Sequence, residues 1–367
     1  MRNKRNGSID FWKFIFAVVI VIFHGKSFGV KEQAYFQGGY IGVEFFFIVS
    51  GFLMANSAEK NHVASETLSL GKDTYLFMKK KILGLMPNIY VAWVIGFIVE
   101  HIGEFSVKGM FRDAFCSISE LLFLTESGFK EYTANSVCWY ISAMLLAMLL
   151  LYPFLRKYKD TFFYIIAPLL CIFLFGFTYH KLQSLSVPYK WVFGICYKSI
   201  IRAVLDITIG CICYKVCFRL KDKKYTLFAR CLWAAVELGG YGVTLFLSWN
   251  HGGERLDWYL ILFLSVAIIC SFAQVSILDD ILSRYRICHW LGEFSFSLFL
   301  GHGYWSHKME ILMPEASYGK RMPVYIVLAF VTGLFIMYSS KWLKYLYGRV
   351  KEKHGKQIRS WFVVENG

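Results

Sequence analysis

Three ionisable residues lie along one apolar segment near the start of the chain. Asp10, Lys13 and His24 interrupt the run SIDFWKFIFAVVIVIFHG, whose other side chains are mainly Phe, Val and Ile. A helix turns by about 100° per residue, so the eleven-residue step from Lys13 to His24 covers about three turns and about 16 Å. Both side chains therefore fall on nearly the same face, with Asp10 one turn before Lys13. An ionisable group at the bilayer centre costs about 2.5–3.5 kcal/mol on insertion scales, which makes these residues functional candidates.

The residue types suggest proton-transfer chemistry. An imidazole titrates near neutral pH, so His24 is a candidate general base. The next apolar segment, GGYIGVEFFFIVSGFLM, carries Glu44 and Ser50. Glu44 is a candidate to orient the imidazole, as the acid does in hydrolase triads. The alternative is that His24 has a structural role and forms a hydrogen bond between membrane helices.

A further polar pair interrupts a later apolar segment. Arg202 and Asp206 are four residues apart, a spacing that suits an ion pair within one helix. The alternative is that both line a cavity. Trp139 and Tyr140 open another apolar segment, where they act either as interfacial aromatic anchors or as stacking surfaces for a sugar.

The elements that carry these residues are predicted to be membrane helices. Hydrophobic residues make up 57% and aromatic residues 19% of the 367-residue chain, and the mean hydropathy is +0.47. Soluble proteins hold about 45–50% apolar residues. The sequence therefore predicts an all-α polytopic membrane protein with about ten spans, over 9–28, 38–55, 83–101, 137–154, 162–180, 199–217, 229–248, 258–276, 290–310 and 323–343.

Lys and Arg favour one orientation of these spans. If the N-terminus is cytoplasmic, the cytoplasmic segments carry most of the 40 basic residues, so the positive-inside rule predicts that both termini are cytoplasmic. The first segment is expected to remain as a membrane helix and not to be cleaved as a signal peptide, because Asp10 and Lys13 interrupt its core and no small-residue cleavage site follows. One integral-membrane domain is expected over 1–346, with a basic cytoplasmic tail over 347–367.

Charge and cysteine content exclude several other classes of function. The net charge of +15 is explained by the cytoplasmic loops and their anionic lipid headgroups, and no nucleic-acid-binding motif accompanies it. The ten cysteines lie mostly in apolar spans and suggest neither a disulfide framework nor a metal site.

The first two segments together resemble the integral-membrane acyltransferase 3 family. Members of that family carry a basic residue, usually Arg, ahead of a helix-embedded His, then a segment of the form GV(D/E)xFFxxSGFL; Lys13, His24 and the stretch from Gly42 to Phe52 match this pattern. Three later stretches are similar to family segments as well: FMKKKILGLMP with Lys80 and Lys81, CWYISAMLLAMLLLYP with Trp139, and LGEFSFSLFLGH, which ends in His302. The resemblance extends from about residue 8 to residue 343. Two positions depart from it, since Lys13 and Gly84 stand where the family usually has Arg.

The resemblance implies an O-acyltransferase of a bacterial-type cytoplasmic membrane. The donor would be acetyl-CoA or another acyl-CoA on the cytoplasmic side, and the acceptor a hydroxyl of an envelope glycan or lipid-linked sugar. No tightly bound cofactor or metal is expected. Lys13, Lys80 and Lys81 would hold the donor phosphates, although each Lys also suits a topology anchor. His302 is a second candidate for the site, or a residue of polar packing near the outer surface.

A non-enzymatic interpretation uses the same polar residues. In a glycan or lipid transporter, His24, Glu44 and the Arg202–Asp206 pair would serve proton coupling or substrate passage. The two interpretations differ in the donor, because a transporter has no reason to consume acetyl-CoA.

Overall fold

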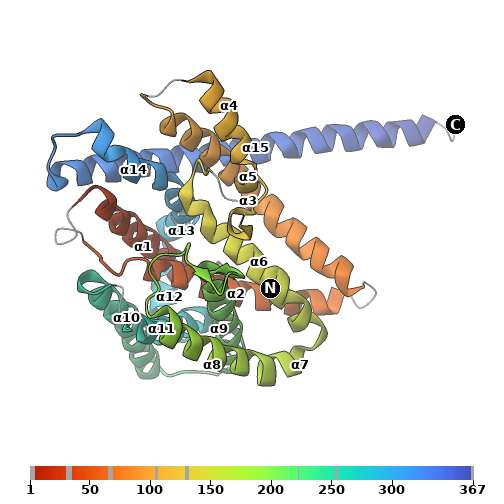
Figure 1. The fold of residues 1–367 in the computed structure, drawn as a ribbon. Coiled ribbons are helices and arrows are strands. Elements are labelled where there is room, and N and C mark those ends of the chain that lie inside the picture. The colour runs from red at the N-terminus through yellow and green to blue at the C-terminus, as the bar shows by residue number, and fades with distance from the viewer. Residues whose placement is uncertain are drawn as a thin grey trace.

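The computed structural model is almost entirely helical, and it describes residues 5–29, 35–64, 69–103, 106–128, 132–221, 223–252 and 255–364, with side chains except at 61–64 and 350–364. Its longer helices are α1 (Gly7–His24), α2 (Ile41–Ala64), α3 (Leu70–Glu100), α4 (Val107–Cys116), α6 (Trp139–Lys157), α8 (Ala167–Phe177), α9 (Lys198–Lys221), α10 (Leu227–Asn250), α11 (Asp257–Ala273), α13 (Arg286–Gly301), α14 (Gly303–Leu312) and α15 (Tyr318–Val364). Short helical turns include α5 (Ile118–Leu121), α7 (Lys159–Thr161) and α12 (Ile277–Leu282), and one antiparallel hairpin pairs β1 (Trp191–Val192) with β2 (Cys196–Tyr197). Figure 1 shows their arrangement. The predicted all-α class is confirmed.

Seven helices in the described part of the chain are long and apolar enough to cross a membrane. They cover Gly7–Phe28, Ile41–Lys60, Leu70–Glu100, Ser136–Lys157, Lys159–Leu182, Leu227–Asn250 and Tyr318–Arg349. Each of them contains or overlaps a predicted span. The chain is thus a multi-pass membrane protein.

The other three predicted spans fall on helices that are shorter or more polar. Helix α11 has 17 residues and α13 has 16, whereas α9 has 24 but carries several charged side chains. The predicted span 290–310 is not one continuous helix, because the helix stops at Gly301 and restarts at Gly303 with His302 between them. The segment before α6 packs into this break: a side chain on Gly303 would lie 2.8 Å from Val137 Cγ1. The Asn135 amide donates to the Leu300 carbonyl at 2.8 Å, so it takes up a carbonyl near the break.

Helices α2 and α9 form the tightest contact in the core. A Cβ atom on Gly51 would lie 2.1 Å from the Ile207 carbonyl oxygen, and one on Gly210 would lie 2.1 Å from that of Ile48. Small residues allow backbones of membrane helices to approach in this way. The two helices run parallel: residue 44 lies beside residue 202, and further along both helices residue 51 lies beside residue 207.

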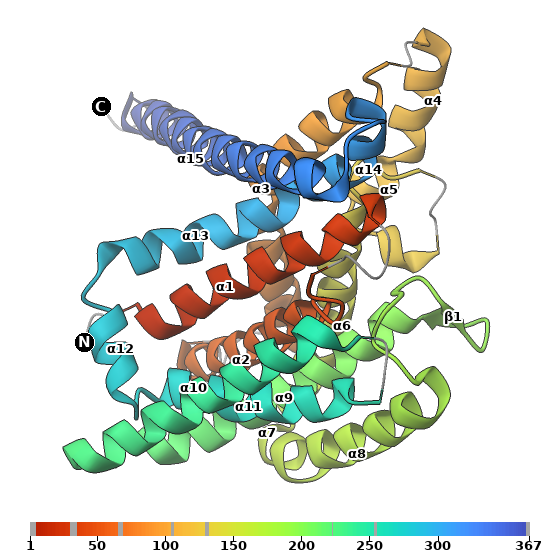
Figure 2. The ribbon, with the colours of Figure 1, turned by 90° about the vertical axis from the view of Figure 1, so that its left-hand side faces the viewer.

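Helix α1 runs parallel to α13, as Figure 2 shows, with α15 crossing above them. The start of α1 and the far end of α15 lie toward the same side in that view. Helix α15 is 47 residues long and continues through the predicted domain boundary at 346/347 without a break.

Candidate active site

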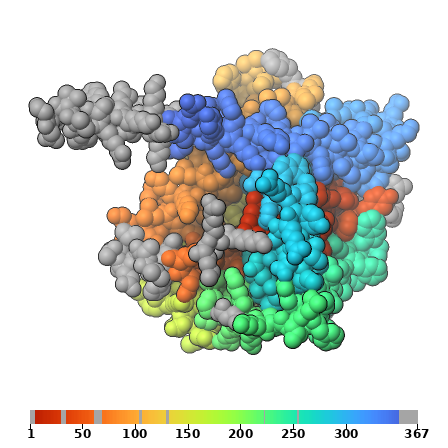
Figure 3. Space-filling view, turned by 180° about the vertical axis from the view of Figure 1, so that it is seen from behind, coloured from red at the N-terminus to blue at the C-terminus, as the bar shows by residue number. Residues whose placement is uncertain are grey.

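A cavity of about 500 Å³ lies between α1, α2, α3, α6 and α13. Figure 3 looks onto the molecule from the side where α3 (orange) and α13 (cyan) border an opening, with α1 (red) behind it. Most of the wall is apolar. The polar and small residues that line it are Lys13, Ser50, Ser57, Lys80, Lys81, Gly84, Tyr140, Gly292 and Ser295.

The three lysines expected to bind the donor line this one cavity. Lys13 comes from α1, and Lys80 and Lys81 come from α3, 67 residues or more further along the chain. Gly84 lies one turn after Lys80 on the same helix, and a Cβ atom there would meet nothing within 4 Å. The cavity therefore has a cationic part with open space beside it, an arrangement that suits an anionic ligand.

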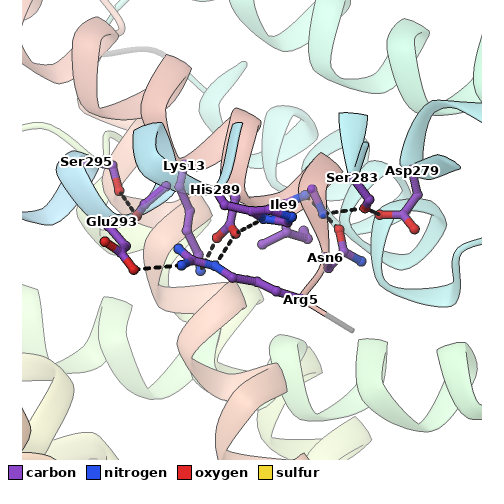
Figure 4. A network of polar contacts seen from close by, with 12 residues as sticks. Arg5, Asn6, Ile9, Lys13, Asp279, Ser283, His289, Glu293 and Ser295 are labelled. Carbon is purple, nitrogen blue, oxygen red and sulfur yellow. Dashed lines mark hydrogen bonds and ion pairs between the residues drawn. The ribbon is translucent and has the colours of Figure 1, made fainter. Parts of the chain in front are cut away.

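A buried carboxylate holds Lys13 in place. Asp10 lies one turn before Lys13, with Asp10 Oδ1 3.6 Å from Lys13 Nζ, and its other oxygen accepts from Arg5 and contacts His289 Nδ1 at 3.0 Å. Arg5 also donates to Glu293 at 2.9 Å. Figure 4 shows these side chains gathered where α13 meets α1.

Close packing of α13 against α1 explains how the Asp10 carboxylate reaches the residues around it. A Cβ atom on Gly292, a residue of the cavity wall, would lie 2.5 Å from the Asp10 side chain. The start of α1 is fixed as well, because Ile9 N–H donates to the Asn6 side chain and Gly7 N–H donates to Ser283 Oγ. The sequence marked Asp10 as a candidate, but no spacing rule links it to His289, 279 residues away.

His24 and His302 form a pair at the end of α1. His302 Nε2 lies 3.3 Å from His24 Nδ1, and the ring centroids are 4.7 Å apart. His24 Nδ1 also lies 2.8 Å from the Ile20 carbonyl oxygen. Because a carbonyl only accepts, Nδ1 carries the proton in the neutral ring, which leaves the lone pair on Nε2. His24 thus has the tautomer that a general base acting through Nε2 requires.

Glu44 makes no hydrogen bond to His24, so the expected relay between them is wrong. The Glu44 carboxylate instead accepts two hydrogen bonds of 2.8 Å from Arg202, and both side chains are fully buried. The expected Arg202–Asp206 pair is also wrong: both Asp206 carboxylate oxygens are buried without a hydrogen-bond partner among the described residues. The close contact between α2 and α9 explains the difference, since it aligns Glu44 with the guanidinium for a bidentate pair.

Four of the five predicted substrate-cavity residues do not line the cavity. Ser50 does, with its Oγ 3.4 Å from the Tyr140 hydroxyl. Trp139 packs against Arg202, whose guanidinium carbon lies 5.5 Å from the ring centroid. The remaining two are Asp206, beside the Glu44–Arg202 pair, and His302, which pairs with His24.

No group of three or more His, Cys, Asp or Glu residues in the described ranges is arranged to hold a metal ion.

Comparison with known proteins identifies the family. The model of the acyltransferase 3 family, described as an acyltransferase domain, matches residues 6–342. No curated protein matches the chain, and no solved structure does. The match begins at the start of α1, ends within α15 and includes every candidate residue of the site. Because the family is one of acyltransferases, the match contradicts the interpretation as a non-enzymatic transporter. The chain belongs to the acyltransferase 3 family and is a membrane acyltransferase.

Proposed function

We propose that this enzyme transfers an acetyl group from cytoplasmic acetyl-CoA to a hydroxyl of an envelope glycan or a lipid-linked sugar. The observation that carries the proposal is the cavity, which combines three lysines with a mainly apolar wall. Coenzyme A has the matching chemistry, since its phosphates are anionic and its pantetheine arm is long and narrow. The lysines would bind the phosphates, and the arm would extend along the apolar wall toward the histidine pair.

In this proposal His24 is the general base. Its Nε2 takes the proton of the acceptor hydroxyl, and the hydroxyl oxygen attacks the thioester carbonyl. The C–S bond then breaks, and the departing sulfur takes the proton back from the imidazolium. His302 contacts the His24 ring at Nδ1, the nitrogen that does not take the proton. The Glu44–Arg202 pair fixes α2 against α9 and takes no part in the proton transfer.

The proposal includes a membrane arrangement with ten spans and both termini in the cytoplasm of a bacterial-type cell. It adds α9, α11 and α13 to the seven long apolar helices. This orientation gives the lysines of the cavity access to cytoplasmic acyl-CoA, and it places His24 toward the outer half of the bilayer, near an envelope acceptor.

The base assignment is tested by replacing His24 in the purified enzyme. His24→Ala is expected to lower the turnover of acetyl-CoA by about 10²–10⁴, the usual contribution of a general base. His307→Ala is the matched control, because His307 is exposed on α14. Wild-type turnover in the His24 variant, with the protein folded and membrane-inserted, would show that another group is the base.

A further inference from the structure

The cavity ends before it reaches the histidine pair. Neither His24 nor His302 lines it, although the proposed reaction needs the thioester carbonyl beside His24. Phe46, Tyr140 and Phe299 line the cavity and contact one another, with ring centroids 5.5 Å apart for Tyr140 and Phe299 and 6.4 Å apart for Phe46 and Phe299. These rings form an aromatic wall at one end of the cavity.

Phe299 is the member of this wall that also contacts a histidine. Its ring centroid lies 5.6 Å from that of His302, and the side chain is 5% exposed. Phe299 lies in the last turn of α13, three residues before His302, so the two side chains leave the helix on neighbouring faces. The Phe299 ring thus borders both the space proposed for the thioester and His302 of the proposed catalytic pair.

We propose that Phe299 is a specificity-determining residue that limits the acyl group to a short chain and separates the thioester from the histidine pair until the donor is in place. This inference rests on the proposed function. Protein interiors are closely packed, so an acyl group reaches His24 only by taking space that the ring occupies or by displacing the ring. An acetyl group needs the least such space, and each added methylene needs more.

The wall has a second consequence. Water that enters from the side of the histidine pair is kept from the thioester. If it reached the carbonyl, it would add there, the C–S bond would break, and acetate and the coenzyme A thiol would be released without transfer to an acceptor. Removal of the ring is therefore expected to cause donor hydrolysis as well as broader acyl specificity.

The test compares Phe299→Ala with Phe296→Ala, using acetyl-CoA and butyryl-CoA. Phe296 lines the same cavity from the same helix, but the structure places it in no ring contact with His302. In Phe299→Ala the ratio of kcat/KM for butyryl over acetyl is expected to rise about tenfold or more, the lower range for hydrophobic size discrimination. Phe296→Ala is expected to change the use of both donors alike. An unchanged ratio in an active Phe299→Ala enzyme would overturn the inference.

A second measurement does not depend on acyl transfer. A cysteine is placed at Ser50, which lines the cavity next to Tyr140, in a background without reactive native cysteines. A small impermeant thiol reagent added outside intact cells is expected to label this cysteine several times faster when Phe299 is Ala than when it is Phe. Equal labelling would refute the wall. If the wild-type enzyme does not consume acetyl-CoA, the proposed function is refuted instead, whatever the labelling shows.

Discussion

The three lysines of the cavity are point charges, and this determines how strongly they hold a donor. Arg binds phosphate through two parallel hydrogen bonds, whereas Lys offers one compact charge on a flexible stem. Lys13 is the exception among the three, because Asp10 restrains it. Lys80 is exposed and Lys81 is half-buried, so their contacts with a ligand would be partly screened by solvent.

Neutralising Lys80 and Lys81 together is expected to raise the KM for acetyl-CoA about tenfold, which corresponds to about 1.4 kcal/mol, and to change kcat little. Phosphate contacts that are equal in the ground and transition states affect binding rather than turnover. The difference from wild type should shrink as salt rises, because screening weakens the wild-type contacts. The measurement is a donor titration of the double Lys→Gln variant in detergent.

The matched control neutralises Lys72 and Lys79, which are exposed on α3 and do not line the cavity. The opposite change is Gly84→Arg, which adds a guanidinium where the structure leaves space and should lower the donor KM. Equal KM values for the Lys80/Lys81 variant and the wild type would return these lysines to the role of topology anchors.

The break between α13 and α14 is the local irregularity that matters most for the site. A continuous helix would carry residue 302 on its surface and leave its backbone paired within the helix. The break is held by the Asn135 side chain, which donates to the Leu300 carbonyl, and by the backbone of residue 135, whose N–H donates to Glu120 at 3.2 Å. Asn135 is fully buried and bonds to the last turn before the break, so we expect it to position His302.

Asn135→Ala is therefore expected to lower kcat by about ten- to a hundredfold with little change in the donor KM, because small displacements near a catalytic group have effects of this size. Steady-state kinetics with acetyl-CoA would separate the two parameters. Asn88→Ala serves as control, since Asn88 of α3 donates to Ser297 of α13 at 3.2 Å, away from the break. A rise in KM with normal kcat would mean that Asn135 supports the cavity instead.

The whole molecule is a bundle whose cationic and histidine sites lie at different depths along α1. The separation follows from the helix itself, because Lys13 and His24 are fixed about 16 Å apart by its rise. The proposed use of cytoplasmic acyl-CoA therefore requires that the lysine end of α1 faces the cytoplasm.

The orientation is tested by cysteine labelling in intact cells, against a background that lacks exposed native cysteines. A cysteine at Ser127, between α5 and α6, is expected to react with an impermeant thiol reagent, and a cysteine at Lys223, between α9 and α10, is expected to react only after the cells are opened. The reverse pattern would place the lysines of the cavity outside and contradict a cytoplasmic donor.

The sequence by itself determined the membrane class, the helical fold, the family pattern and the stripe of Asp10, Lys13 and His24. These are local properties, set by hydropathy and by the period of one helix. The lysines at 80 and 81 also followed from the sequence, through the resemblance of one short segment.

Only the tertiary structure decided which side chains meet. Sequence spacing suggested that Arg202 pairs with Asp206, because residues four apart are neighbours on a helix, but the approach of α2 to α9 gave the guanidinium a buried bidentate partner in Glu44. His302 joined His24 through a contact over 278 residues of chain, and the fold brought Phe299, which contacts His302, into the wall of the cavity. Such contacts depend on the packing of whole helices and on a break in one of them, and neither is written in the periodicity of a single segment.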